Sequence, residues 1–137
     1  MSVQVVKMEF DDAEMALDHA VMEDLRTAVG QTAFDEIIGD AIFEVTERIA
    51  RIEQLAEERN LAVMARVAHD LVAVAGQIGL SGVSVIAANL ERCCASDEPV
   101  AAYAIARRLV RMDEASLIPA AKLSVDLAQT KDGAQAG

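Results

Sequence analysis

Apolar residues recur at the spacing of an α-helix along most of this chain, and that periodicity limits the folds open to it. The longest run has an acidic opposite face, and its apolar positions are Phe34, Ile38, Ala41, Ile42, Val45, Ile49, Ile52 and Leu55. Aromatic residues make up only 3% of the 137 residues, with two prolines and seven glycines, which is too few for a β-sandwich or barrel of this size. The sequence therefore predicts an all-α fold.

Capping signals predict the limits of the first helices. Asp18 is a candidate N-cap for a short helix that begins at His19 and ends at Gly30. The segment Thr32-Ala33-Phe34-Asp35 has the form of a capping box for the long helix, which runs to about Arg59 and breaks at Asn60.

The second half of the chain predicts three more segments. One helix spans about 61–78 and ends at Gly79, a second begins after a Ser81 cap, and a third begins near Asp97 and Pro99. Pro119 stops or kinks the pattern, and a short amphipathic tail follows. Short connections predict an up-and-down four-helix bundle with a short additional N-terminal helix. We assign 1–16 to an N-terminal extension, 17–124 to the bundle and 125–137 to a flexible C-terminal tail.

The charge balance disfavours nucleic acid and membrane partners. The formal net charge is −11, and nearly all of the excess lies in residues 1–60. An acidic chain repels phosphate backbones. No apolar run approaches the roughly 18–20 residues of a spanning helix, and MSVQVVKMEF lacks the features of a signal peptide. With the adjacent Cys93 and Cys94 read as reduced thiols, a cytoplasmic location is expected.

Metal and cofactor sites are not expected. The chain has two histidines, His19 and His69, and none of the H-E-x-x-H, E-x-x-H or C-x-x-C patterns. It also lacks a glycine-rich phosphate loop, so a self-contained ATP-dependent enzyme is disfavoured. His19 is expected to be an ordinary surface residue.

The helix over 61–78 carries the informative face. On a helical wheel His69 lies about 160° from Leu71, which is at the centre of the apolar stripe. The residues around His69 are small or basic: Ala62, Ala65, Arg66, Ala73 and Gly76, with Val72 at the flank. Small side chains around an ionisable imidazole suggest a platform on which another protein docks, although a lone exposed histidine is more often only a surface residue.

Residues 68–91, AHDLVAVAGQIGLSGVSVIAANLE, resemble the signature of the histidine phosphotransfer (HPt) domain family. The matching features are Ala68-His69, Leu71, Gly79 and Leu90-Glu91, and the segment LRTAVGQTAFDEIIGDAIFEV is similar to the family's short helix, glycine and long helix. The resemblance covers about residues 17–112. It implies a four-helix bundle whose exposed histidine takes a phosphoryl group from a receiver-domain aspartate.

The resemblance also implies roles for single residues. His69 would be the phosphoacceptor through Nε2, and Glu91 would accept a hydrogen bond from Nδ1–H. Val72 stands where the family commonly has Lys, and Ala73 stands where it commonly has Gly. Arg66, one turn before His69, is the candidate substitute for the missing cation.

The expected function is that of a stand-alone phosphorelay carrier in two-component signal transduction. Its partners would be response-regulator receiver domains and a sensor or hybrid histidine kinase, and the chain would be a phosphotransfer intermediate rather than a self-contained catalyst. A non-catalytic interaction module that uses the same face is the alternative. A sensor-kinase dimerisation hairpin would suit His69 followed by Asp70, but it fits five helical segments poorly. A monomer is expected because such a bundle buries its own core.

Overall fold

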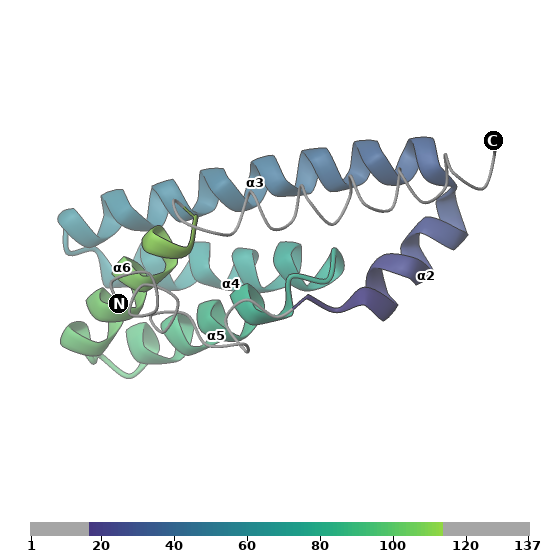
Figure 1. Ribbon diagram of the computed structural model, residues 1–137. Coiled ribbons are helices and arrows are strands. Elements are labelled where there is room, and N and C mark those ends of the chain that lie inside the picture. The colour runs from purple at the N-terminus through teal and green to yellow at the C-terminus, as the bar shows by residue number, and fades with distance from the viewer. Residues whose placement is uncertain (1–16, 114–137) are drawn as a thin grey trace, which may run out of the picture.

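The computed structural model describes residues 17–113, and within this range the chain forms five α-helices and no β-strand (Figure 1). The helices are α2 (His19–Val29), α3 (Gln31–Glu57), α4 (Leu61–Gln77), α5 (Ser81–Ala95) and α6 (Pro99–Met112). Short turns reverse the chain between successive members of α3 to α6. The all-α prediction is confirmed: α3 to α6 form the bundle, and α2 is the short additional helix. The predicted N-terminal extension, the segment around Pro119 and the C-terminal tail lie outside the described residues.

The apolar stripes meet in one core. Phe34, Ile38, Val45, Ile49, Ile52 and Leu55 of the predicted α3 stripe are buried, whereas Ala41 and Ile42 at its edge are half-buried. Met22, Met64 and Met112 are buried among them, as expected of flexible side chains that fill a core.

The four bundle helices pack in a ring. Each helix contacts two neighbours, in the order α3, α4, α5, α6 and back to α3. The seam between α4 and α5 is therefore on the opposite side of the bundle from the seam between α3 and α6. Among the described helices, none combines the length and apolar character needed to cross a bilayer.

The predicted Asp18 cap is confirmed, and Asn60, predicted only as the break after the long helix, also caps the helix that follows it. Asp18 Oδ1 accepts a hydrogen bond from the Val21 amide at 3.1 Å, and Asn60 Oδ1 accepts one from the Val63 amide at 3.2 Å. Each side chain satisfies a backbone donor that has no partner within its helix.

Two other predicted caps are wrong. Gly30, with φ +86°, ends α2 and leads directly into α3, so that helix begins at Gln31 before the predicted capping box. Asp35 instead accepts a hydrogen bond from Gln31 Nε2 at 2.8 Å. Ser81 is the first residue of α5 rather than its cap, because the chain turns at Leu80 to bury that side chain.

A close backbone contact joins the start of α2 to the turn between α4 and α5. The Asp18 amide donates to the Gly79 carbonyl at 2.7 Å. Gly79 has φ +82°, and a Cβ at this position would lie 2.7 Å from the Asp18 carbonyl oxygen. Glycine is therefore required here both by the backbone conformation and by the space available.

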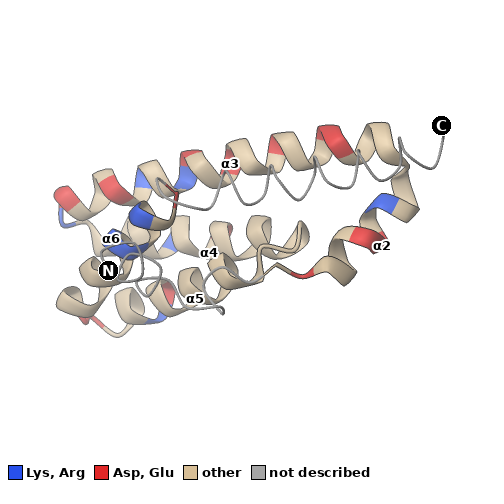
Figure 2. Cartoon of the chain, viewed as in Figure 1, with Lys and Arg blue, Asp and Glu red and all other residues tan. Residues whose placement is uncertain are grey.

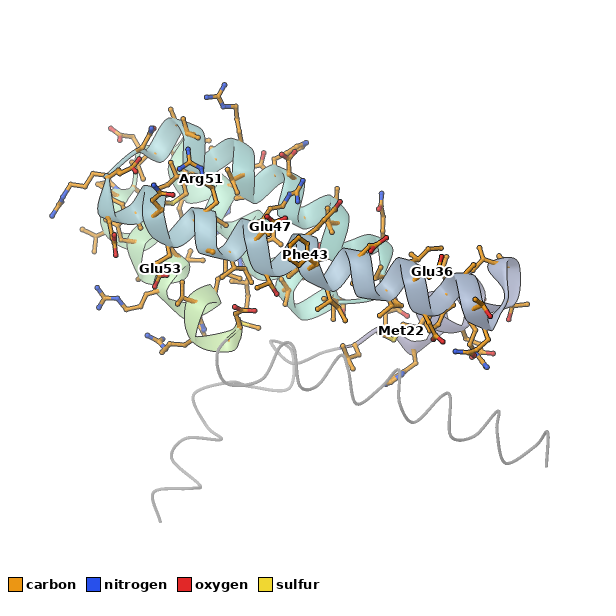
Figure 3. The ribbon with its side chains drawn as sticks, turned by 90° about the horizontal axis from the view of Figure 1, so that it is seen from above. Met22, Glu36, Phe43, Glu47, Arg51 and Glu53 are labelled. Atoms are coloured by element: carbon orange, nitrogen blue, oxygen red, sulfur yellow. The ribbon has the colours of Figure 1, made fainter. Side chains whose placement is uncertain are left out.

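The outward face of α3 is acidic, as the sequence predicts (Figure 2). Glu36 and Glu47 are exposed along it, and Phe43 lies between them in the view of Figure 3. Phe43 is 65% exposed, so it is not part of the core.

Candidate functional site

His69 lies on the outer face of α4. Its side chain is 71% exposed, whereas Met64, Ala68, Leu71 and Ala75 on the inner face of the same helix are buried. The angular position opposite Leu71 therefore places the imidazole in solvent, as the periodicity predicts. The helix that carries it has an Asn60 cap at its start and a core-facing stripe along its length, so the imidazole stands on a rigid element.

Glu91 reaches His69 from the neighbouring helix α5. Glu91 Oε2 lies 3.0 Å from His69 Nδ1. An ionised carboxylate only accepts hydrogen bonds, so Nδ1 is the donor and the neutral imidazole keeps its lone pair on Nε2. The hydrogen bond thereby favours the tautomer that carries its lone pair on Nε2.

The small side chains predicted around His69 share one surface. We call it the His69 face and define it as His69 with Ala62, Ala65, Arg66, Val72, Ala73 and Gly76. Ala65 and Val72 are half-buried where α4 meets α5, and the other members are exposed. None of the predicted site residues lies in the core.

A second polar contact ties α5 to α4 beside His69. Ser84 Oγ donates to the Val72 carbonyl at 3.0 Å. A Cβ on Gly76 would lie 3.5 Å from the Ser84 Oγ. Because Ser84 and Glu91 are seven residues apart, both lie on the side of α5 that faces α4. These two contacts join α5 to α4 along the outer side of their seam.

The same helical spacing extends the His69 face onto α5. Ala88 and Ala95, three residues before and four residues after Glu91, are both exposed. Ser84, Ala88 and Ala95 were not among the predicted site residues. Counting helical turns from Glu91 would have found them.

The His69 face carries one basic side chain. Arg66 is exposed and forms no ion pair with any residue between 17 and 113. The three lysines of the chain are Lys7, Lys122 and Lys131, all outside that range. Within the described structure, Arg66 is thus the cation nearest in sequence to His69, and no lysine replaces the one absent at Val72.

The cysteines do not form a second reactive centre. Cys93 and Cys94 are both buried and unbridged. Burial, and secondarily the neighbouring Cys93, raises the pKa of the Cys94 thiol, which keeps it protonated and poorly nucleophilic. In the described part of the chain, His, Cys, Asp and Glu side chains form no group of three or more that could hold a metal ion.

Comparison with known proteins gives one family. Residues 36–129, more than half of the chain, match the model of the Hpt domain family. The matched segment contains both His69 and Glu91. No curated protein and no solved structure gives a significant match to the chain.

Proposed function

The chain belongs to the Hpt domain family, whose members carry phosphoryl groups in phosphorelays, and we propose that His69 is its phosphoacceptor. The observation that carries the proposal is the exposed imidazole whose Nδ1 lies 3.0 Å from Glu91 Oε2. That contact leaves Nε2 both accessible and nucleophilic.

The transfer proceeds from a phosphorylated receiver domain. His69 Nε2 attacks the phosphorus of the aspartyl phosphate, so the P–N bond forms as the P–O bond to the aspartate breaks and the aspartate leaves as a carboxylate. The ring gains positive charge while Nδ1–H stays hydrogen-bonded to Glu91, whose negative charge stabilises the imidazolium. The reverse reaction passes the group to the receiver domain of a response regulator.

The receiver domain supplies the rest of the chemistry. Phosphoryl transfer depends on positioning and on a divalent cation that neutralises the developing charge. The chain contributes the nucleophile and the docking surface, so it acts as an intermediate rather than as a self-contained catalyst. A sensor or hybrid histidine kinase upstream and a response regulator downstream would be the partners of the chain in such a relay.

The His69 face suits the approach of a receiver. Ala62, Ala65, Ala73 and Gly76 project little beyond the backbone, so a second protein can bring its aspartate to within bonding distance of Nε2. Ala88 on α5 continues this low surface.

We assign to Arg66 the stabilisation of the negative charge on the phosphohistidine. A phosphoryl group carries a charge of about −2 near neutral pH and is stabilised by a nearby guanidinium. With Val72 at the position where the resemblance leads one to expect lysine, Arg66 is left to supply this interaction.

Phosphotransfer from a receiver tests the proposal. The wild-type chain, incubated with a phosphorylated receiver domain, should acquire phosphate that is labile in acid and stable in base. His69→Gln should acquire none, and its free energy of unfolding should change by about 0.5 kcal/mol or less because the site is exposed. His19→Gln on α2 is the matched control and should accept phosphate normally. A wild-type chain that binds receivers but takes no phosphate would instead identify a non-catalytic interaction module.

A further inference from the structure

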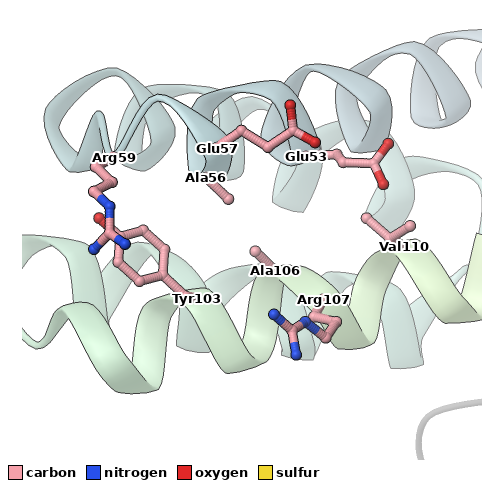
Figure 4. Close-up of a pocket in the computed structure, with 8 residues that line it drawn as sticks. All are labelled: Glu53, Ala56, Glu57, Arg59, Tyr103, Ala106, Arg107 and Val110. Atoms are coloured by element: carbon pink, nitrogen blue, oxygen red, sulfur yellow. The ribbon is translucent and has the colours of Figure 1, made fainter.

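The seam between α3 and α6 forms a second surface, on the opposite side of the bundle from the α4–α5 seam. A groove of about 310 Å³ runs along it (Figure 4). The groove lies between the C-terminal end of α3 and residues 103–110 of α6, and it shares no residue with the His69 face.

The two helices that line this groove present opposite charges, and Arg59, just after α3, adds a cation at one end. Glu53 and Glu57 project from α3 on one side, and Arg107 projects from α6 on the other (Figure 4). All three side chains are exposed, and none of them forms an ion pair with another described residue. Each wall therefore presents charged side chains that are available to a partner.

The floor of the groove is apolar and made of small side chains. Ala106 is buried there, and Ala56 and Val110 are half-buried. Tyr103 lies at one end with the Arg59 guanidinium 5.9 Å from its ring centroid. An apolar centre with a charged rim, including Tyr and Arg, is the usual composition of a protein–protein interface.

We propose that this surface, which we call the α3–α6 face, binds a second copy of the chain. A two-fold axis that runs along the seam lays α3 of one copy over α6 of the other, so Glu53 and Glu57 meet the second copy's Arg107. The same pairing is repeated on the other side of the axis. A two-fold axis at right angles to the helices would instead lay α3 on α3 and place like charges together.

This dimer is compatible with a bundle that folds alone. The core is buried within one copy, so self-association is reversible and belongs to the class of small, weak interfaces. Because the α3–α6 face lies opposite the α4–α5 seam, both His69 side chains of the dimer stay accessible. The inference does not depend on the phosphoacceptor role of His69.

Charge exchange in the full-length chain tests the pairing. The wild type should dimerise with rising concentration in sedimentation equilibrium. Glu57→Arg and Arg107→Glu should each weaken the dimer at least about tenfold, and the double variant should recover most of that loss because the opposite charges again face each other. The control variants are Glu36→Arg and Arg51→Glu on the outward side of α3 (Figure 3), which change the net charge equally and should leave the dimer unchanged.

The control variants are needed because the effect of salt on dimerisation does not separate local charge pairing from general repulsion. With a net charge of −11, two copies repel each other in general, and salt screens this repulsion together with the local attraction. A chain that stays monomeric at all concentrations overturns the proposal, and so does a dimer indifferent to both single reversals. Intramolecular cross-links between this groove and residues 114–137 in the monomer would assign the groove to that segment and overturn the proposal too.

Discussion

Glu91 on α5 holds His69 on α4 through one hydrogen bond, with Oε2 3.0 Å from Nδ1. The two residues are 22 positions apart in the chain, yet the antiparallel packing of their helices brings them together at the surface. The imidazole thus has a fixed orientation while its side chain remains largely in solvent.

Glu91→Ala should change the tautomer of His69. Without the carboxylate, the proton on Nδ1 loses its acceptor, and the tautomer with hydrogen on Nε2 gains population. We expect phosphorylation by a receiver to slow by roughly tenfold, equivalent to about 1.4 kcal/mol in the barrier. The ¹⁵N chemical shifts of the imidazole measure the tautomers directly.

Glu91→Gln separates charge from geometry, because an amide oxygen still accepts from Nδ1–H but does not stabilise an imidazolium. Its tautomer population should resemble the wild type while its transfer rate stays low. If both variants transferred phosphate at the wild-type rate, Glu91 would have no positioning role.

Val72→Lys should lengthen the lifetime of phosphohistidine. The position is half-buried at the edge of the His69 face, three residues after His69 and therefore one helical turn away. An ammonium there adds a second cation near the phosphoryl group, in addition to the proposed interaction with Arg66. The rate of phosphate loss from the isolated phosphoprotein should fall, and Ala28→Lys on α2 should leave it unchanged. An unchanged rate in Val72→Lys would place the position away from the phosphoryl group.

The α4–α5 pair shows which part of the site the sequence determines. Apolar spacing on one helix suffices to place His69 opposite Leu71, because a helix has a fixed angle per residue. The contact with Glu91 depends on how two helices align, and its prediction rested only on the resemblance to a family. The Ser84 bond to the Val72 carbonyl is a tertiary contact with no local pattern, so it was missed.

The helix limits likewise separate into those that local interactions determine and those that they do not. Asp18 caps its helix as predicted, because a cap is a local interaction over three residues. Asn60, predicted only as a helix break, caps α4 in the same way. The Thr32 and Ser81 caps failed where a neighbouring residue decided the turn: Gly30 with its positive φ in one case, and the buried Leu80 in the other. The groove between α3 and α6 joins residues about 50 positions apart, which periodicity alone does not align.

Alkaline pH should weaken the fold partly through Cys94. Burial raises the pKa of this thiol above its ordinary value of 9.0. At pH values above that, the unfolded chain loses the proton first, so the free energy of unfolding falls as pH rises. In Cys94→Ala this part of the decline should be absent, as measured by urea unfolding at several pH values between 8 and 10.5. Equal slopes for the two proteins would contradict the assignment.

Gly79→Ala should destabilise the protein. The substitution forces a side chain into φ +82° and brings its Cβ to 2.7 Å from the Asp18 carbonyl oxygen, which belongs to the backbone and cannot move freely. Strain of this kind costs about 1–3 kcal/mol, and the steric contact adds to it.

Gly39→Ala is the matched control. That glycine lies within α3 with nothing within 4 Å of the added Cβ, so alanine should stabilise the helix by about 0.5–1 kcal/mol. Urea unfolding of both variants measures the difference, and an unchanged Gly79→Ala would mean that α2 moves away from the turn at little cost.

Ala73→Trp and Ala88→Trp should block receiver binding from the two sides of the α4–α5 seam. Ala73 follows His69 by one turn on α4, and Ala88 precedes Glu91 by one turn on α5, so an indole at either position rises above the low surface around the imidazole. A close-packed interface does not absorb a group of that size without strain or a gap. We expect each variant to weaken receiver binding at least about tenfold, or 1.4 kcal/mol, with an unchanged circular dichroism melt because both sites are exposed.

Ala28→Trp on α2 controls for the added indole and should bind normally. Phosphorylation by a small phosphodonor, where the chain accepts one, should survive in both variants, since only the approach of a large partner is obstructed. If Ala73→Trp bound less tightly and Ala88→Trp bound normally, the receiver would contact α4 alone, and the His69 face would end at the seam.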